Sequence, residues 1–291
     1  MMRKEDSLAV VILTYNSEGS IERTLRSARK VTSSIFVVDS YSQDRTVLIA
    51  EEMGAHVVQR VFENYSVQRN WAITNLGNRF TWQLHIDSDE EVTEQLAEQI
   101  RSRLSIATDK ANGFLVRRRT VFLGHAMRFG GTTRFHARLF RSPNGHCEER
   151  LYDLHFIVDG EVDKLAGFLL DHNETSLNTW TERHNRWSTM EAMQMSGPQG
   201  GTETQQLNGP IKRVRARKSL YYRFPLLLRA PAFFAWRYFV LLGFLDGQAG
   251  LIFHGLQGLW FRFLVDAKIW EAHAYRRDPR FGSTSSPNES E

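Results

Sequence analysis

The chain of 291 residues contains a single cysteine, Cys147, and no apolar run of the length that crosses a bilayer. One thiol excludes an internal disulfide framework and any zinc site built from several cysteines. A membrane-spanning helix needs about 20 consecutive apolar residues, and the apolar run nearest the N-terminus, residues 8–13, is also too short for the core of a signal peptide. The sequence therefore predicts a cytoplasmic protein.

Two nucleotide-binding signatures are also missing. No Gly-x-Gly-x-x-Gly follows the first apolar run, and no glycine-rich loop ends in a Walker lysine. These absences argue against a dinucleotide-dependent oxidoreductase and a P-loop enzyme. The net charge of +4 is mildly basic. Because no nucleic-acid-binding module is recognisable and the aromatic residues cluster with aliphatic ones, nucleic acid is not an expected partner.

The first ninety residues alternate between strand and helix patterns. Apolar, β-branched runs predict strands at 8–13, 34–38, 57–58 and 80–86, with helical spacing between them. Such alternation is typical of an α/β domain with right-handed crossovers and a mainly parallel sheet. Polar segments follow three of these strands at 14–17, 39–42 and 87–90. Since ligands bind beyond the carboxyl ends of parallel strands, we expect the three segments to converge on one crevice.

Asp87-Ser88-Asp89 is the segment most suggestive of chemistry. Two carboxylates at i and i+2 can supply hard oxygen ligands to Mg²⁺ or Mn²⁺ while the metal bridges a substrate diphosphate. The alternative is that these residues only cap a helix predicted to start at Val92. Their position after the fourth strand favours the metal site. Asp39, after the second strand, could likewise cap a turn or accept hydrogen bonds from a base or ribose.

Taken in order, residues 10–18 (VVILTYNSE), 37–46 (VVDSYSQDRT), 68–72 (QRNWA) and 87–89 (DSD) resemble glycosyltransferase family 2 over roughly residues 7–175. The resemblance implies a GT-A fold, a nucleoside-diphosphate sugar donor that is usually UDP-linked, and inversion at the anomeric carbon. It implies that Asp89 is the principal metal ligand, that Asp87 lies near the ribose or the metal, and that Asp39 contacts the base. The residues that it assigns to nucleotide-sugar binding are Thr14, Tyr15, Asn16, Glu18, Asp39, Ser40, Arg69, Asp87 and Ser88.

Residues 138–140 (RLF), 148–151 (EERL) and 165–167 (LAG), leading to Asp171-His172, are similar to bacterial lipopolysaccharide-core and exopolysaccharide β-glycosyltransferases. An inverting transfer needs a general base for the acceptor hydroxyl, and Glu149 is the first candidate and Glu148 the second; both could instead be surface residues of a loop. His172 is either a further metal or diphosphate ligand or a structural histidine. The arginines at 117, 118, 119, 128 and 134 could bind an anionic ligand or form a solvated face.

The last third of the chain has a different composition. Seven basic residues and no acidic one lie between 211 and 229, followed by apolar, aromatic-rich stretches at 232–245 and 251–265. This pattern favours association with an anionic membrane surface, with Lys and Arg facing headgroups and Trp, Phe and Leu at the acyl boundary. The alternative is a helical subdomain that packs on the catalytic core or on a second subunit. The expected domains are residues 1–210 (GT-A), 211–275 (helical, membrane-associating or dimerising) and 276–291 (a disordered tail).

These features predict a glycosyltransferase that uses Mn²⁺ or Mg²⁺ and a UDP-sugar, with a glycan or lipid-linked glycan acceptor, at the cytoplasmic face of the inner membrane. Two alternatives remain open. One is a polyprenyl-phosphate glycosyl synthase, whose lipid-phosphate acceptor needs no base. The other is a non-catalytic assembly protein that binds nucleotide sugars.

Overall fold

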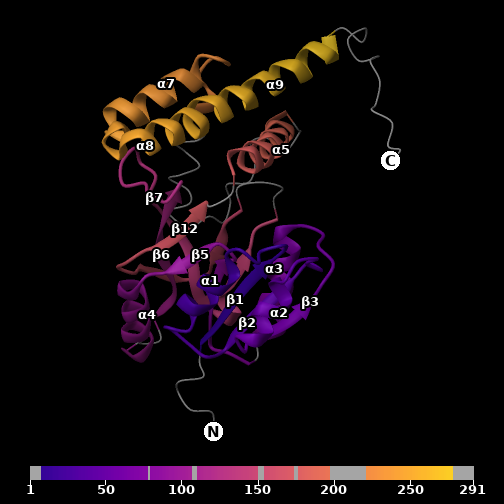
Figure 1. The fold of residues 1–291 in the computed structure, drawn as a ribbon, viewed down its shortest axis with the longest axis vertical. Helices are drawn as coiled ribbons and strands as arrows, with labels where there is room; N and C mark the ends of the chain where they lie inside the picture. Colours follow the sequence, from indigo (N-terminus) through magenta and orange to yellow (C-terminus); the bar gives the residue numbers. More distant parts are fainter. Residues whose placement is uncertain are drawn as a thin grey trace. The chain divides into compact units, whose positions relative to one another are not determined.

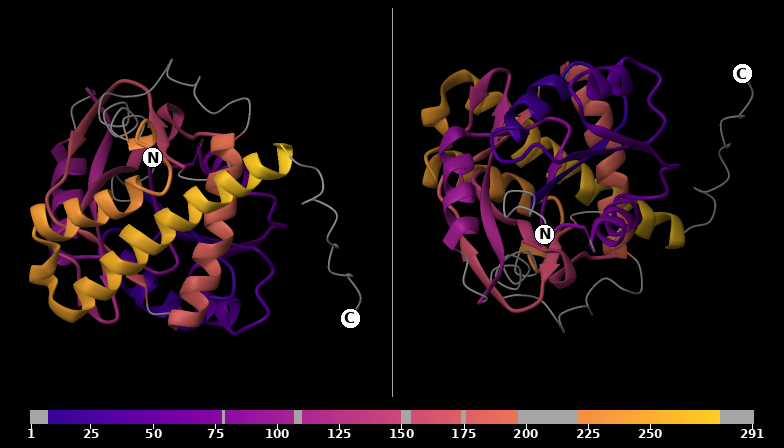
Figure 2. Two further views of the ribbon diagram at one scale, coloured as in Figure 1. Left: turned by 90° about the horizontal axis from the view of Figure 1, so that it is seen from above. Right: turned by 90° about the horizontal axis from the view of Figure 1, so that it is seen from below.

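The computed structural model describes residues 8–77, 79–106, 110–149, 154–173, 176–196 and 221–277, and the chain divides into two compact units, 1–174 and 175–291. Each unit is described by itself (Figures 1 and 2). The sequence pattern suggested a boundary near residue 210, whereas the division falls after residue 174, because helix α5 (Leu177–Ser196) packs against helix α9 (Phe261–Arg277). Residues 211–220 and 278–291, which belong to the predicted second and third regions, lie outside the described residues.

The first half of unit 1 has the predicted alternation. Its elements are β1 (Leu8–Thr14), α1 (Ile21–Ala28), β2 (Ile35–Asp39), α2 (Thr46–Glu52), β3 (His56–Gln59), α3 (Tyr65–Leu76) and β4 (Trp82–Asp87). The strands β3, β2, β1 and β4 are neighbours in that order and are parallel throughout. Helix α3 begins where the side chain of Asn64 accepts a hydrogen bond from the Val67 amide at 2.9 Å, a typical N-cap.

The second half of unit 1 extends the sheet with mixed polarity. Its elements are β5 (Glu90–Val92), α4 (Glu94–Ile106), β6 (Ala111–Phe122), β7 (His125–Ala126), β8 (Arg134–Arg141), the 3₁₀ turn η2 (Ser142–Asn144), β9 (Gly145–Cys147), β10 (Phe156–Val158), β11 (Glu161–Lys164) and β12 (Leu169–Asn173). The sheet continues from β4 through β8, β6 and β12 to β5, with β8 antiparallel to both β4 and β6. The helix predicted from Val92 begins instead at Glu94, because residues 90–92 pair with β12 as a short strand.

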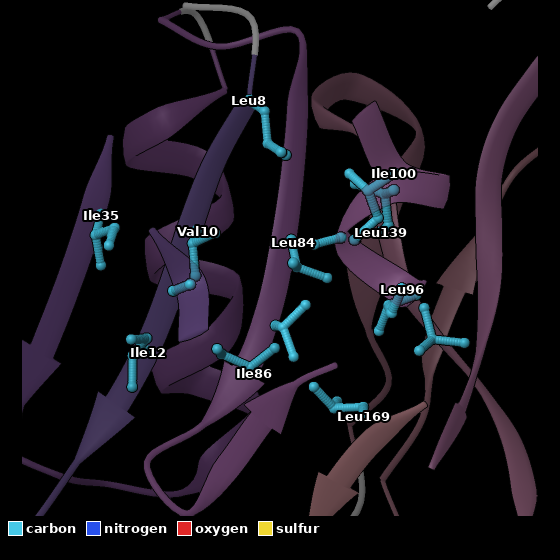
Figure 3. Packing of buried hydrophobic residues seen from close by; sticks show 14 of the residues in the cluster. Leu8, Val10, Ile12, Ile35, Leu84, Ile86, Leu96, Ile100, Leu139 and Leu169 are labelled. Carbon is cyan, nitrogen blue, oxygen red and sulfur yellow. The ribbon is translucent and has the colours of Figure 1, made fainter. Parts of the chain in front are cut away.

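The largest apolar cluster of unit 1 lies between the sheet and the helices α1, α2 and α4. Leu84 and Ile86 of β4 pack with Val10 and Ile12 of β1 and with Leu96 of α4, and all five are fully buried. Figure 3 shows these side chains between the strands and the helices. Each such side chain contributes about 1.5–3 kcal/mol on burial. This packing holds β1 and β4 in register, and therefore holds the polar segments that follow them.

Unit 2 is helical in its described residues. Besides α5 and α9 it contains α7 (Arg229–Ala235), the π-helical turn η3 (Trp236–Val240), the 3₁₀ turn η4 (Gly243–Asp246), α8 (Gly247–Phe253) and the π-helical segment η5 (His254–Trp260). Helices α7 and α9 lie side by side, and the chain reverses between them around η4 (Figures 1 and 2). None of the described helices alone is long and apolar enough to cross a membrane. One pair, 229–240 and 243–275, satisfies the length and composition criteria together but is bent by 73°.

Candidate nucleotide-sugar and metal site

The polar segments after β1, β2 and β4 meet at one edge of the sheet, as the sequence predicted. The Thr14 hydroxyl donates to the Asp39 carboxylate at 2.9 Å, and the Asn16 amide donates to the Ser42 hydroxyl at 2.9 Å. The hydroxyls of Ser17 and Ser88 are 2.9 Å apart. These contacts join residues 25 to 71 positions apart, so the crevice is a product of the parallel strand order.

Asp39 is the buried carboxylate that accepts several of the hydrogen bonds in this crevice. It is fully buried, and its two oxygens accept hydrogen bonds from Thr14, from the amide and hydroxyl of Ser42, and from the Gln59 side chain at 2.5–3.1 Å. The Asp39 carboxylate therefore ties the β2 loop to β1 and β3. A contact between Asp39 and a nucleotide base stays a prediction. To accept a hydrogen bond from a base, the Asp39 carboxylate would have to lose one of these hydrogen bonds.

The other predicted nucleotide-binding residues surround this loop. The Asn16 side chain accepts from the Gln43 amide at 2.8 Å, and the Glu18 side chain accepts from the Arg45 amide at 3.1 Å. Ser40 donates its amide to the Thr14 carbonyl at 2.9 Å. Tyr15 is exposed at the rim of the loop. Asn16 and Tyr41 have φ values of 47° and 61°. This left-handed conformation is uncommon for non-glycine residues and is often found at functional sites.

A cluster of carboxylates and guanidiniums fills the site behind Asp87. Asp87 forms ion pairs with Arg69 and, at 2.9 Å, with Arg138. Arg138 also contacts Glu90 at 3.2 Å, and Glu90 accepts the Asp87 amide at 2.8 Å. Burial alone would raise the pKa of Asp87, but Arg138 and Arg69 outweigh it and hold that pKa well below its ordinary value. Asp87 is therefore ionised, and arginines engage both its oxygens.

Arg118 and Asp171 extend the cluster to β6 and β12. Arg118 pairs with Glu90 at 2.8 Å and with Asp171 at 3.0 Å. Burial opposes the charge of Arg118, but Asp171 and Glu90 raise its pKa. Arg138 lies at an irregularity in the pairing of β6 and β8. Phe114 faces Leu139 and Leu115 faces Ala137, so Arg138 has no residue opposite it in β6. A β-bulge of this kind commonly redirects a side chain next to an active site.

Asp89 differs from its neighbours in having no arginine bound to its carboxylate in the described part of the chain. Burial raises the pKa of Asp89 to about 7, and the negative charges of Asp171, Asp87 and Glu90 add to the effect. Four carboxylates (Asp87, Asp89, Glu90, Asp171) face three guanidiniums (Arg69, Arg118, Arg138), which leaves one uncompensated negative charge when all are ionised. The residues therefore fit a divalent cation next to Asp89.

The predicted third metal ligand, His172, lies beside Asp89 through its backbone. Its amide donates to the Asp89 carbonyl at 3.0 Å, while its ring lies 2.9 Å from the Glu91 carboxylate. No described group of three or more His, Cys, Asp or Glu side chains is arranged to hold a metal ion by itself. A metal that bridges Asp89 to a diphosphate needs only one or two protein carboxylates, because Mg²⁺ sites of this type are completed by phosphates and water.

The two candidate bases, Glu148 and Glu149, have different surroundings. Glu148 is buried, and its Oε1 accepts the His155 amide at 2.8 Å and contacts the His155 ring at 3.0 Å. It thereby joins β9 to β10. Glu149 is exposed, and no hydrogen bond or ion pair holds its carboxylate within the described residues.

Sequence reasoning assigned no site role to Glu90, Arg138 or Asp171, and it offered Arg118 only as one of five arginines that could bind an anionic ligand. Glu90 could have been suspected because it directly follows the Asp87–Asp89 segment and is acidic. The other three come from β6, β8 and β12, and no spacing along the chain relates them to Asp87. Only the strand order brings them together.

The comparisons agree with this architecture. Residues 9–148 match the model of the family "Glycosyl transferase family 2". A protein of Rickettsia bellii named "Uncharacterized glycosyltransferase" is 39% identical over 93 residues, which is 32% of this chain and 31% of that protein. The matched segment thus spans about a third of the length of the Rickettsia relative. The "Lipopolysaccharide core biosynthesis glycosyltransferase LpsC" of Rhizobium meliloti is 25% identical over 94% of this chain and 95% of its own.

Among solved structures, mannosyltransferase PcManGT from Pyrobaculum calidifontis, in complex with GDP-Man and Mn²⁺, superimposes with a TM-score of 0.50 at 14% identity. The match covers 94% of this chain and 88% of that one. It confirms the predicted GT-A fold. The match to the family 2 glycosyltransferase model covers just under half of the chain.

The raised pKa of Asp89 has a consequence for the stability of the metal-free protein. Between pH 4, near the ordinary pKa of aspartate, and pH 7 the folded state binds more protons at Asp89 than the unfolded state does. The stabilisation from this group is therefore complete below pH 4 and is lost as the pH rises through 7. Asp89→Asn should remove this dependence.

In EDTA, Asp89→Asn is expected to be more stable than the wild type by about 1–2 kcal/mol at pH 8 and by little at pH 4.5, as measured by urea denaturation. Comparing the two proteins at each pH cancels the contributions of other titrating groups, such as the buried His85, whose pKa burial lowers. Equal stability of the variant and the wild type at both pH values would contradict the environment described for Asp89.

Proposed function

We propose that this protein is a metal-dependent, inverting glycosyltransferase that moves a sugar from a nucleoside-diphosphate donor, UDP-linked in the first instance, to a glycan acceptor of the cell envelope. The observation that carries the proposal is the Asp89 carboxylate. It lies at the carboxyl edge of the parallel strands, in the segment similar to family 2, and it is the carboxylate that gives its cluster one negative charge in excess when all members are ionised.

The residues around Asp89 suit a metal–diphosphate complex. Mn²⁺ or Mg²⁺ bound there would neutralise the charge that develops on the departing diphosphate. Asp89 is the ligand that we assign first. His172 is the further candidate, and Asp87 contributes mainly by orienting Arg69 and Arg138. The segments that surround Asp39, which include Thr14, Tyr15, Asn16, Glu18, Ser40 and Ser88, would hold the nucleoside.

Direct displacement at the anomeric carbon requires that a carboxylate take the proton of the acceptor hydroxyl. We assign this role to Glu149, whose carboxylate is exposed and unengaged within the described residues, so an incoming hydroxyl can reach it. Glu148 is the second candidate. Its contacts with His155 instead suit a residue that holds the antiparallel strands β9 and β10 together.

The acceptor is proposed to be a lipopolysaccharide-core or related lipid-linked glycan, met at the cytoplasmic face of the inner membrane. Two observations support this class of acceptor. The LpsC relative, which carries lipopolysaccharide core biosynthesis in its name, matches over nearly the whole of both chains. The C-terminal third combines basic residues with aromatic, apolar stretches, which suits an enzyme that works at a lipid surface. A dimer formed through this region is the alternative.

The test is a panel of UDP-, GDP- and TDP-sugars, each scored for Mn²⁺-dependent hydrolysis and for binding of the matching nucleoside diphosphate by calorimetry. We expect one donor class to be hydrolysed, and hydrolysis to stop in EDTA. Binding without any hydrolysis or transfer would favour the non-catalytic assembly protein, and no binding at all would reject both. Transfer to a polyprenyl phosphate that does not depend on Glu149 would favour the polyprenyl-phosphate synthase.

A further inference from the structure

The helical hairpin formed by α7, η3, η4 and α8 exposes apolar side chains and buries charged ones. From residue 224 to residue 245 every exposed side chain is apolar. They are Phe224, Pro225, Leu227, Leu228, Pro231, Ala232, Ala235, Trp236, Phe239, Val240, Leu241, Leu242, Phe244 and Leu245. Single exposed apolar residues are ordinary on a protein surface, but a continuous patch of this extent marks an interaction site.

The two charged residues of the same segment, Arg229 and Arg237, are buried, as is Asp266 of α9. Arg229 and Asp266 are both almost fully buried and form an ion pair in which the Arg229 Nε donates at 2.7 Å. Arg262 pairs with the buried Glu191 of α5 at 2.9 Å. Arg237 is buried, with its guanidinium over the rings of Phe233 and Phe253. As a result, no charged side chain between residues 224 and 265 is exposed.

The end of the hairpin is apolar on all sides. Four consecutive residues, Phe239 to Leu242, are exposed, so no single face is reserved for a partner. Leu242 has a φ of 58°, a conformation usually given to glycine or asparagine at an exposed turn. A protein–protein interface covers one face of a helix, whereas a segment that is apolar all round is typical of immersion in lipid.

The length of the hairpin sets how far it can extend into the hydrocarbon core of a bilayer. The arm 229–240 contains 12 residues, and at about 1.5 Å per residue it extends about 18 Å. This is too short for the hydrocarbon core of about 30 Å but matches one leaflet. The chain reverses direction around η4, so that α9 runs back alongside α7 and the chain leaves on the side from which it came.

We propose that the tip of this hairpin, residues 236–245, inserts into the hydrocarbon of one membrane leaflet and returns, anchoring the protein without crossing the bilayer. This mode differs from the interfacial binding expected from the sequence, in which Lys and Arg face the headgroups. In the described residues the arginines of the hairpin face its interior. The inference deepens the membrane association proposed above, but its test needs neither a sugar donor nor activity.

The experiment is flotation of the full-length protein with vesicles of zwitterionic phosphatidylcholine, with and without 20% phosphatidylglycerol, at low salt and in 0.5 M NaCl. Insertion of an apolar tip is expected to persist in high salt and on zwitterionic lipid, because salt screens only the electrostatic attraction to headgroups. The tip variant is Leu241→Gln/Leu242→Asn, since asparagine tolerates the left-handed conformation. We expect it to lower the vesicle-bound fraction at least tenfold.

The matched control is Leu48→Gln/Ile106→Gln, which changes two exposed apolar residues of unit 1 and should float like the wild type. Thermal melts would verify that both variants fold. Binding that needs anionic lipid and is lost in 0.5 M NaCl would overturn the proposal in favour of interfacial binding. Failure to float, with a dimer that the tip variant dissociates, would overturn it in favour of a second copy of the chain. Either result would leave the donor assays of the proposed function unaffected.

Discussion

Asp89→Asn is expected to lower the rate of metal-dependent sugar transfer by on the order of a thousandfold. Asparagine keeps the size of the side chain but removes the one carboxylate of the cluster that no arginine binds in the described residues. Stabilisation of the leaving diphosphate by a metal is worth several kcal/mol, and each 1.4 kcal/mol changes a rate tenfold. Initial rates at saturating donor, together with Mn²⁺ titration in the presence of UDP, measure both consequences.

The Asp89→Asn substitution should also weaken Mn²⁺ binding. In the wild type, Mn²⁺ binding should strengthen as the pH rises towards 7, because a proton and the metal compete for the Asp89 carboxylate. Asp163→Asn is the matched control, since Asp163 is an exposed carboxylate of β11 that pairs with Arg103. An Asp89→Asn enzyme that retained Mn²⁺-dependent transfer near the wild-type rate would assign the metal to other residues.

The meeting of the polar segments at one edge of the sheet could be predicted from the sequence, because it depends only on the strands being parallel. Alternating strands and helices imply parallel strands, and parallel strands bring their carboxyl ends to one edge. Thr14, Asp39 and Asp87 each end a strand, so their proximity did not depend on the exact register. The GT-A fold followed from the same pattern together with the family resemblance.

The partners of Asp87 depend on features that leave little trace in the sequence. Arg138 reaches the site through an irregular pairing of β6 and β8, and Arg118 through the position of β6 next to β12. Arg118 is one of five arginines between residues 117 and 134 that could equally have formed a solvated face. The same limit applies to the C-terminal hairpin. The sequence shows Arg229 as the last residue of a basic run, but only the folded chain shows it buried and paired with Asp266, 37 residues away.

Glu149→Gln is expected to reduce kcat by about 10²–10⁴-fold, the usual contribution of a general base, with little change in the affinity for the nucleotide. Glutamine preserves the shape of the side chain but cannot take the proton of the acceptor hydroxyl. The exposed, unengaged carboxylate of Glu149 is the observation behind this expectation. Single-turnover transfer rates combined with calorimetric UDP affinity separate the loss of chemistry from a loss of binding.

Glu148→Gln provides the internal comparison, because the two residues are adjacent and chemically identical. Glutamine at position 148 can still accept the hydrogen bond from the His155 amide, but the contact with the His155 ring is weakened. We expect a loss of stability of about 1 kcal/mol, the value of a typical hydrogen bond, and a kcat within a few fold of the wild type. The opposite pattern, with kcat collapsing at Glu148 and preserved at Glu149, would transfer the role of base to the buried residue and make His155 its positioning partner. Full activity in both variants would instead fit an acceptor that is already ionised, such as a lipid phosphate.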